Sequence, residues 1–355
     1  MVFVRTTTPR PVDVTAVFPE LASLGRPAIR LHPRAGSPSV RESSVGGPLL
    51  WSVTEPWPHC EGSHLDSGCR RSPAEVRLER SMRARLHRDP RGPAFTPEEE
   101  AIKDRNAAML RERLDAGPPW PAECRVPMLP VAQLYLRDIP LLRPPGQADL
   151  LQILWCPYDH DPDYKPSTAL FWRSAATVVD ILATPPEPYE ADYPGYVPEP
   201  CLLAPEAITE YPNSLDLSPE MRQVLGDWNR WQAADVGVDS SYADYPAEFY
   251  DSELADAPGW KVGGWPPWGR TDPYPRFCAV CDVQMVPLLT IASFEWDGGT
   301  RGWAPYEDQA AAFADSHVAG QDPAQPTAVE VGSTDNMQLY VCPASPEHPH
   351  TDLIQ

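Results

Sequence analysis

Cysteine and histidine residues near the C-terminus have the spacing of metal ligands. Cys278 and Cys281 are separated by two residues, and Cys342 follows a later apolar run. A tight turn can direct both thiolates of a Cys-x-x-Cys pair at one ion, and structural zinc is usually held by four such ligands. We therefore predict that these three cysteines share a structural zinc ion. The alternative is a turn without metal whose cysteines are small buried groups.

The fourth ligand of this site is less obvious. Ser345 stands three residues after Cys342, where a second Cys-x-x-Cys pair would place its thiol. Two histidines follow within reach of the same turn. We take His348 as the fourth ligand, and His350 is the alternative.

A constant offset of 217 residues relates this region to an earlier part of the chain. The matched residues are Val45-Gly46-Gly47, Trp51, Thr54, Pro56 and Pro58 with Val262-Gly263-Gly264, Trp268, Thr271, Pro273 and Pro275. Further on, the apolar runs 128–134 and 151–157 parallel 285–291 and 337–343, and their length and composition predict buried strands. So many matches indicate an internal repeat. We therefore expect an α+β, β-rich fold made of two tandem copies with a few short peripheral helices.

The first copy contains its own set of ligands at the corresponding places. Cys60 and His64 form one Cys-x-x-x-His pair, and Cys156 and His160 form another. Together they make a Cys2His2 set of the kind that closes a structural zinc site. Cys69 is a possible substitute ligand. The sequence thus predicts one or two structural zinc ions.

The other two cysteines, Cys124 and Cys201, have no partner by spacing, and we expect both to be buried. The N-terminus lacks the apolar run of a signal peptide, and no segment reaches the length of a membrane span. We therefore expect a cytoplasmic protein, in which disulfides are uncommon.

The repeat divides the chain into four parts. Residues 1–29 are a lead-in, and residues 30–160 are the first copy with a helical insertion at about 70–117. Residues 161–258 form an acidic connection rich in proline and tyrosine, and residues 259–355 are the second copy with the Cys-x-x-Cys knuckle.

Four helices are predicted, the first three of them from capping patterns. They begin at Ser72-Pro73 with Glu75 as the capping-box partner, at Thr96-Pro97 with Glu99 and an end near Ala116, at Ser218-Pro219 with an end near Ala234, and at Tyr306 with an end near Val318. The third has an apolar face, Met221, Val224, Leu225, Trp228 and Trp231. We expect this face to pack on the core, and a partner-binding face is the alternative.

Charge is unevenly distributed along the chain. The net charge is −21, but residues 1–120 carry 18 basic and 15 acidic side chains, whereas the remainder carries 11 and 35. An acidic surface repels phosphate backbones, so nucleic acid is a poor partner for most of the chain. Eight arginines lie between residues 70 and 91 and could grip phosphates. We favour a solvated helix whose arginines neutralise acidic side chains of the same protein.

Catalytic motifs are missing from the sequence. It has no Gly-x-Ser-x-Gly elbow, no phosphate-binding Gly-Lys-Ser/Thr loop and no His-Glu-x-x-His helix. The double glycines at 46–47 and 263–264 lack the later glycines of a nucleotide loop, so we expect turns that need positive φ or close packing.

The order KVGGWPPW, Cys-x-x-Cys, MVPLLTIAS and QLYVC resembles the pattern shared by bacterial YwqG-like proteins and the related programmed cell death protein 2 family. The resemblance covers residues 261–350 well and the same landmarks of the first copy more loosely. It implies a β-rich duplicated fold, zinc knuckles in many members and no established enzymatic reaction. The family's metal positions correspond to Cys278, Cys281 and Cys342, and Ser345 departs from the pattern. Eukaryotic members act as chaperone-like binders of a basic ribosomal protein, and some bacterial members are linked to toxin-immunity gene neighbourhoods.

Together these features favour a non-enzymatic, zinc-stabilised scaffold, monomeric or weakly dimeric, that binds a protein or peptide, plausibly a basic one. An RNA-associated or RNA-processing factor that uses the arginines is the alternative. A metallohydrolase with an open zinc is a third and weaker hypothesis.

Overall fold

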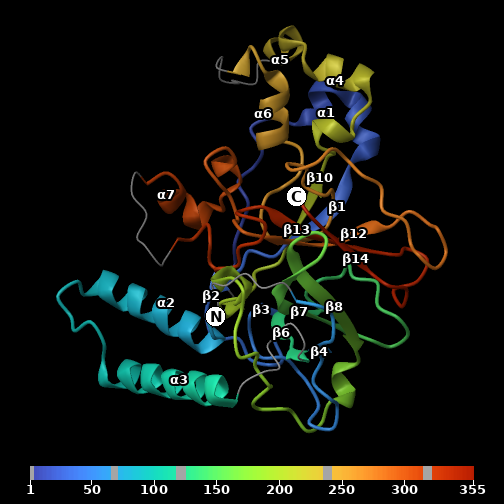
Figure 1. Cartoon of the computed structure of the whole chain (residues 1–355). Coiled ribbons are helices and arrows are strands. Elements are labelled where there is room, and N and C mark those ends of the chain that lie inside the picture. Colours follow the sequence, from blue (N-terminus) through green and yellow to red (C-terminus); the bar gives the residue numbers. More distant parts are fainter. Residues whose placement is uncertain (1–3, 65–70, 117–124, 235–241, 315–321) are drawn as a thin grey trace.

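The computed structural model describes residues 4–64, 71–116, 125–234, 242–314 and 322–355. Within these residues the strands form two six-stranded sheets and one two-stranded ribbon, and the helices lie at the periphery (Figure 1). The fold is therefore α+β and β-rich, as the sequence predicts.

The N-terminal sheet holds most strands of the first half of the chain. Its strands, in spatial order, are β2 (Arg34–Ala35), β9 (Cys201–Leu202), β3 (Ser44–Val45), β6 (Leu129–Tyr135), β7 (Leu150–His160) and β8 (Lys165–Arg173). The separate ribbon pairs β4 (His59–Cys60) with β5 (Val126–Pro127).

The C-terminal sheet has the same number of strands. Its order is β10 (Glu206–Glu210), β1 (Arg26–Arg30), β11 (Lys261–Gly263), β12 (Val286–Ala292), β13 (Asn336–Val341) and β14 (Thr351–Ile354). The four apolar runs that the sequence predicts to be buried strands coincide with β6, β7, β12 and β13, so those predictions are confirmed.

The two sheets share one pairing register. In the N-terminal sheet Val45 of β3 pairs with Ala132 of β6. In the C-terminal sheet the corresponding residues, Val262 of β11 and Leu289 of β12, pair in the same way. The pairing of β6 with β7 shifts between Pro130 and Ala132, and that of β12 with β13 shifts between Pro287 and Leu289. A proline cannot donate to the ladder, so an irregularity beside it is expected in both places.

The leading strands cross between the sheets. β1 begins before residues 30–160 yet pairs with β11 of residues 259–355, and β9 precedes residues 259–355 yet pairs with β3 of residues 30–160. The predicted boundary between residues 29 and 30 therefore cuts through β1, and residues 26–29 belong to a sheet rather than to a loose lead-in. The predicted connection 161–258 likewise contains β8, β9 and β10.

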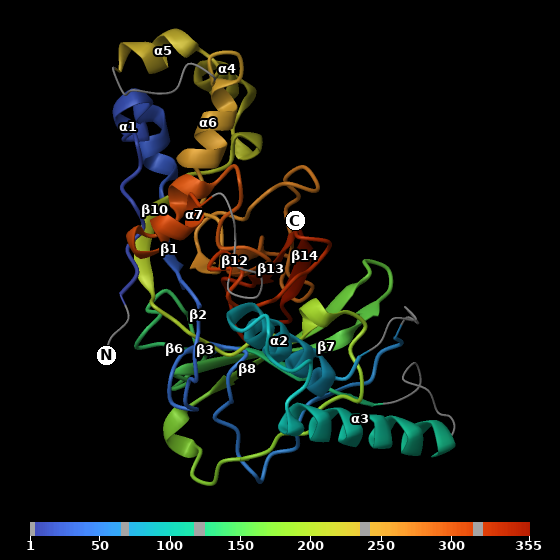
Figure 2. The ribbon, with the colours of Figure 1, turned by 90° about the vertical axis from the view of Figure 1, so that its left-hand side faces the viewer.

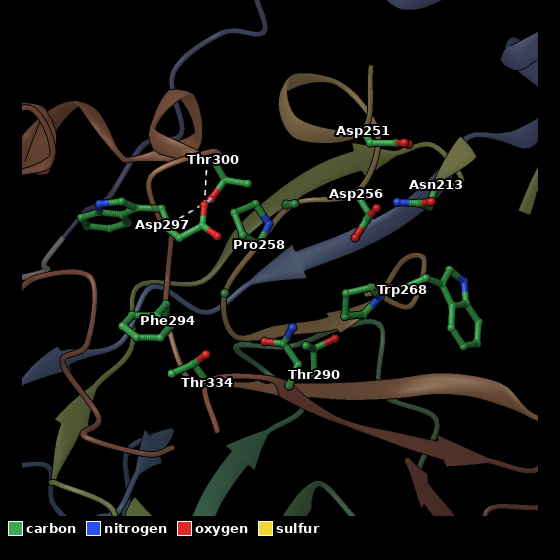
Figure 3. Close-up of a pocket in the computed structure, with 15 residues that line it drawn as sticks. Asn213, Asp251, Asp256, Pro258, Trp268, Thr290, Phe294, Asp297, Thr300 and Thr334 are labelled. Atoms are coloured by element: carbon green, nitrogen blue, oxygen red, sulfur yellow. Dashed lines mark hydrogen bonds between the residues drawn. The ribbon is translucent and has the colours of Figure 1, made fainter. Parts of the chain in front are cut away.

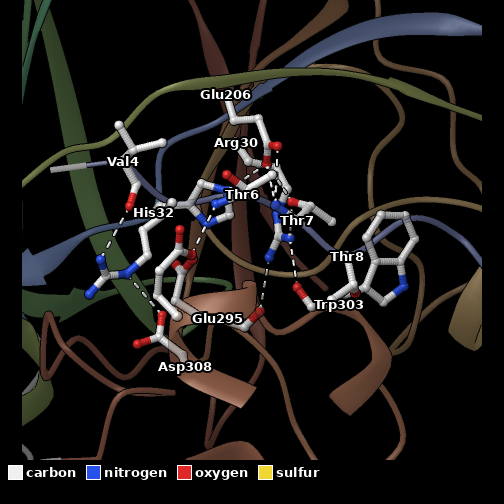
Figure 4. Close-up of polar contacts among 12 residues, drawn as sticks. Val4, Thr6, Thr7, Thr8, Arg30, His32, Glu206, Glu295, Trp303 and Asp308 are labelled. Atoms are coloured by element: carbon white, nitrogen blue, oxygen red, sulfur yellow. Dashed lines mark hydrogen bonds and ion pairs between the residues drawn. The ribbon is translucent and has the colours of Figure 1, made fainter. Parts of the chain in front are cut away.

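A buried polar cluster lies at the end of β1 and the start of β10 (Figure 4). Arg30 donates a hydrogen bond to the Trp303 carbonyl, and Thr7 donates to the carboxylate of Glu206. Burial lowers the pKa of His32 to about 4, so its neutral ring donates to Glu206 across 3.0 Å. These contacts anchor the N-terminal segment on the second half of the chain.

The main core lies between the two sheets. One apolar cluster contains Ile29, Val262, Leu289 and Met337 from the C-terminal sheet together with Leu151 from the N-terminal sheet. The sheets therefore pack face to face, and removal of this apolar surface from water is the main stabilising contribution.

The helical insertion is a hairpin beside the N-terminal sheet (Figure 2). It consists of α2 (Pro73–Arg88) and α3 (Pro97–Ala116). The side chain of Ser72 accepts from the Glu75 N–H while Glu75 accepts from the Ser72 N–H, and Thr96 and Glu99 repeat this exchange. Both predicted capping boxes are confirmed.

Other helices cap the C-terminal sheet (Figure 1). They are α1 (Val14–Val17), α4 (Pro219–Leu225), α5 (Trp228–Ala233), α6 (Pro246–Glu253) and the short α7 (Gln309–Ala312). The single helix predicted from Ser218 to Ala234 is two helices, because Asp227 caps a new start with its side chain. Leu225 and Trp231 are buried in a cluster with Phe18, which confirms that this face packs on the core.

The helix predicted from Tyr306 to Val318 is shorter in its described part. A 3-10 turn covers Tyr306–Asp308, α7 ends at Ala312, and residues 315–318 lie outside the described residues. Among the helices that the structure describes, none combines the length and apolar character needed to cross a membrane.

Candidate metal centres

The first metal set comprises Cys60, His64, Cys156 and His160, and the structure brings all four together as predicted. Cys60 ends β4, and the turn after it carries His64. Cys156 and His160 are both on β7, and its pairing with β8 is irregular between Trp155 and Asp159.

The geometry of the first metal set is compact. Its four ligand atoms lie within 4.8 Å of one another, and the sulfur of Cys60 is 3.7 Å from Nε2 of His160. A Cβ at Gly62 would lie 3.3 Å from the His160 ring, so the turn from Cys60 to His64 has little room for a side chain there.

The two cysteines of this set have pKa values shifted in opposite directions. Cys156 donates a hydrogen bond to the Cys60 sulfur, and this contact together with His160 and His64 lowers the pKa of Cys60 to about 2. Burial raises the pKa of the Cys156 thiol. The site therefore favours at least one thiolate, the form in which cysteine binds metal.

The knuckle set comprises Cys278, Cys281, Cys342 and His348. The Cys278 N–H donates to the Val283 carbonyl, and the Val280 N–H points at the Cys278 sulfur across 3.4 Å. This tight turn directs the thiols of Cys278 and Cys281 to one side, as the two-residue spacing predicts.

The turn after β13 supplies the rest of the knuckle set. The His348 N–H donates to the Ser345 carbonyl, and this turn places the His348 ring 3.4 Å from the Cys278 sulfur. Burial opposes ionisation of Cys342, but the N–H groups of Ser345 and Ala344 and the His348 ring lower the pKa of Cys342 to about 6. Ser345 is therefore not a ligand itself, but its carbonyl group closes the turn that positions His348.

His350, the alternative fourth ligand, lies elsewhere. Its Nε2 atom is 2.9 Å from the Thr168 hydroxyl on β8, outside the knuckle set. The choice between the two histidines is therefore settled by geometry in favour of His348.

Both sets have the dimensions of a tetrahedral zinc site. In a tetrahedral site, zinc bound to sulfur at about 2.3 Å and to nitrogen at about 2.0 Å separates neighbouring ligand atoms by about 3.3–3.8 Å. The short separations found are 3.7 Å in the first metal set and, in the knuckle set, 3.4 Å both between Cys278 and His348 and between Cys281 and Cys342. The residues fit the ion.

The remaining predicted cysteines take no part in either set. Cys201 is buried, as predicted, and its thiol donates to the Pro326 carbonyl across 3.2 Å. Cys69 and Cys124 lie outside the described residues.

The arginines of α2 are largely paired within the chain. Arg71 and Arg83 pair with Glu79, Arg77 with Glu187, Arg80 with Glu199 and Arg85 with Glu99. The Arg80 side chain also donates to three backbone carbonyls, those of Pro194, Val197 and Ala328. These five arginines therefore neutralise acidic side chains of the same chain, as predicted.

The double glycines behave as the sequence predicts. Gly46 has a φ of +61°, and Gly263 and Gly264 have φ values of +74° and +69°. Gly47 has ordinary φ but packs against Ser44 and Pro38, where a Cβ would collide.

Sequence reasoning missed a pocket beside the C-terminal sheet (Figure 3). It has a volume of about 270 Å³ and is bordered by Asp251, Asp256 and Asp297, with Trp268 and Thr290 also in its walls. Comparison of positions related by the sequence offsets could have indicated it, because large apolar residues in 30–160 have small or polar counterparts here.

No protein-family model matches the chain, and no curated protein matches it either. The geometry therefore has to carry the functional argument.

Proposed function

We propose that the protein is a non-enzymatic scaffold that binds a protein or peptide and that its two Cys/His sets hold structural zinc. The observation that carries the proposal is that each set offers four protein ligand atoms within 4.8 Å. Four protein ligands complete a tetrahedral shell, whereas catalytic zinc keeps one position for water or substrate. An ion in either set would join chain segments rather than activate a substrate.

The residues around each set support a structural role for zinc. In the first metal set, an ion would fasten the ribbon that ends in Cys60 to β7 through Cys156. In the knuckle set, an ion would fasten the Cys278 turn to the end of β13 through Cys342. Two short segments with few backbone pairings of their own would then be held to the sheets.

Exposed apolar side chains on the knuckle support a binding role. Phe277 and Val280 are 53% and 61% exposed, and Tyr274, Val283 and Val286 are exposed nearby. Apolar groups gathered on a soluble surface often mark an interaction site. The acidic balance of residues 121–355 favours a basic partner, because opposite charges steer encounters.

The family assignment is part of the proposal. We place the chain among YwqG-like proteins on its motif order, and we infer a tandem duplication from the shared register of the two sheets together with the sequence offsets. Within that family a chaperone-like or immunity-like task suits a protein that binds a basic partner, acting as a monomer or weak dimer in the cytoplasm.

Metal analysis and affinity capture test the two parts separately. We expect two zinc ions per purified chain, and a folded protein that contains no zinc would contradict the structural role. We also expect capture from cells of the source organism to recover basic proteins and to weaken as salt is raised. Recovery of acidic proteins that salt does not affect would contradict the binding proposal.

A further inference from the structure

The two copies differ on one face of their sheets. Three equivalent positions are large and apolar in the N-terminal sheet but small or polar in the C-terminal sheet. By offset, the pairs are Leu50 with Pro267, Tyr135 with Ala292 and Leu150 with Asn336. The three large residues form a buried cluster with Val178, whereas Pro267 and Asn336 line the pocket. The second copy thus leaves open a space that the first copy fills.

The first copy also shows what kind of group suits this face. The Arg173 guanidinium lies 3.8 Å from the ring centroid of Trp51, pairs with Glu55 and donates to the buried Gln152. Trp51 corresponds to Trp268 of the pocket. At the position of Arg173, the second copy has the C-terminal Gln355, which contacts Thr271 instead. The chain therefore fills the face with its own guanidinium in one copy and not in the other.

The pocket has a buried carboxylate at its wall whose hydrogen-bonding capacity is not used by other described side chains. Asp251 accepts hydrogen bonds from Ser214, and Asp297 accepts from Thr300. The Asp256 side chain is only 9% exposed and makes no hydrogen bond to another side chain among the described residues. Its Oδ2 atom forms one long ion pair with Lys261, across 3.7 Å.

Lys261 is shared between two carboxylates, and Asp256 is the more distant one. The Lys261 ammonium donates to both oxygens of Glu210 at 2.9 and 3.0 Å, so Glu210 is its closer partner and the Asp256 carboxylate can still accept hydrogen bonds from a second cation. Figure 3 shows Asp256 and Asp297 on either side of Pro258, with Thr290 below them on the sheet. Negative charge on both sides and aromatic rings in the wall are the features that recognise a cation.

We propose that this pocket receives an arginine side chain of the basic partner. The inference rests on the proposed binding function and names the group that is recognised. Asp256 would accept the guanidinium hydrogen bonds, and Trp268 and Phe294 would border its planar face. Lysine would fit the charge but not the planar geometry that Arg173 displays in the first copy.

Protonation of Asp256 gives the interaction a dependence on pH. Burial raises the pKa of Asp256 to about 7. The positive charge of Lys261 on β11 lowers this pKa, whereas the negative charges of Glu210 on β10 and Asp251 on α6 raise it. Arginine keeps its charge throughout this range. Binding should therefore weaken as pH falls from 8 to 6.

N-acetyl-arginine amide is a direct probe, with N-acetyl-lysine amide as its comparator. Titration followed by the indole N–H resonances should show shifts with the arginine compound at pH 8 and weaker shifts with the lysine compound. Asp256→Asn should reduce affinity at least about tenfold, the loss expected for a buried charge-assisted contact. Asn336→Leu, which fills the pocket as Leu150 does, should abolish the shifts without removing a charge. Asp272→Asn, which removes an exposed carboxylate outside the pocket, should change affinity less than twofold.

The outcomes separate the pocket from the broader function. The proposal that the pocket binds arginine is overturned if Asp256→Asn and Asp272→Asn weaken the affinity for the arginine compound equally. It is also overturned if the arginine compound shifts no indole resonance. If the captured basic partner still binds the Asp256→Asn protein as tightly as the wild type, the pocket is wrong while the binding function stands. If the wild type retains no basic protein, the binding function itself fails.

Discussion

The first metal set and the knuckle set occupy corresponding ends of the two sheets but face different surroundings. Cys60 and Cys156 belong to a buried apolar cluster with Trp51 and Trp57. Cys281, by contrast, is exposed, and the knuckle around it carries exposed Phe277 and Val280. The first metal set is thus enclosed by the interior, whereas the knuckle set combines buried Cys278 and Cys342 with one exposed ligand, Cys281. The open pocket lies in the same half of the chain as the knuckle set.

Loss of the first metal set should have the largest effect. We expect Cys156→Ser to lower the free energy of unfolding by about 3 kcal/mol or more, because it removes a ligand from the core and leaves its partners unmatched. Zinc content should fall by one ion per chain. Cys201→Ser is the matched control, since this buried cysteine lies outside both sets, and its zinc content should not change. Similar stability of the two variants would mean that the first metal set holds no ion.

The exposed knuckle should respond less and more locally. We expect Cys281→Ser to cost about 1–2 kcal/mol and one zinc ion, because Cys281 is itself exposed and its loss leaves less buried surface unmatched than the loss of Cys156. Amide exchange should accelerate around the Phe277–Gln284 bridge but not in β6 or β7. Faster amide exchange throughout the chain would show that loss of the knuckle ion is not confined to its own surroundings.

The two candidate histidines provide a sharper test of the knuckle. His348→Ala should release its zinc and lower stability by about 1 kcal/mol, whereas His350→Ala should keep both ions. The reason is that His348 faces Cys278 while His350 contacts Thr168. Cobalt substitution provides the measurement, because loss of one nitrogen ligand alters the absorption of a thiolate-rich site. Retention of the unaltered spectrum in His348→Ala would exclude this ligand.

Local patterns were sufficient to predict much of the fold. The capping boxes at Ser72 and Thr96 and the apolar runs of β6 and β12 encode their structure within a few residues. The metal sets were predictable for the same reason, because a ligand pair such as Cys278 and Cys281 is positioned by one short turn.

Long-range pairing was not predictable in this way. Nothing in residues 26–30 specifies that β1 joins the sheet of the second copy, since Ile29 would fit any apolar neighbour. The break in the helix predicted from 218 to 234 depends on one side chain, Asp227, that caps a new start in competition with helix continuation. The pocket was not predicted because two of its carboxylates, Asp251 and Asp256, come from the connection, and because its space exists where side chains are small.

Asp256 makes a weaker prediction about the open pocket. Its pKa is raised from 3.8 in the unfolded chain to about 7, so between these values the folded state binds more protons and stability falls as pH rises. Asp256→Asn lacks this loss, and we expect it to be more stable than the wild type by about 1 kcal/mol or more at pH 8. The advantage should shrink toward pH 4. Denaturant unfolding at several pH values measures it, and an advantage independent of pH would contradict the buried charge.

Filling the pocket should have the smallest effect on stability. Asn336→Leu copies Leu150, which is fully buried at the equivalent position of the first copy. We expect a gain of about 0.5 kcal/mol, because a leucine there would remove apolar surface from water without displacing a hydrogen-bonded side chain. Denaturant unfolding is the measurement, and Asp272→Asn, at an exposed site, should leave stability within error. A loss of stability would show that the second copy cannot accommodate what the first copy contains, and that the two faces differ in shape as well as in composition.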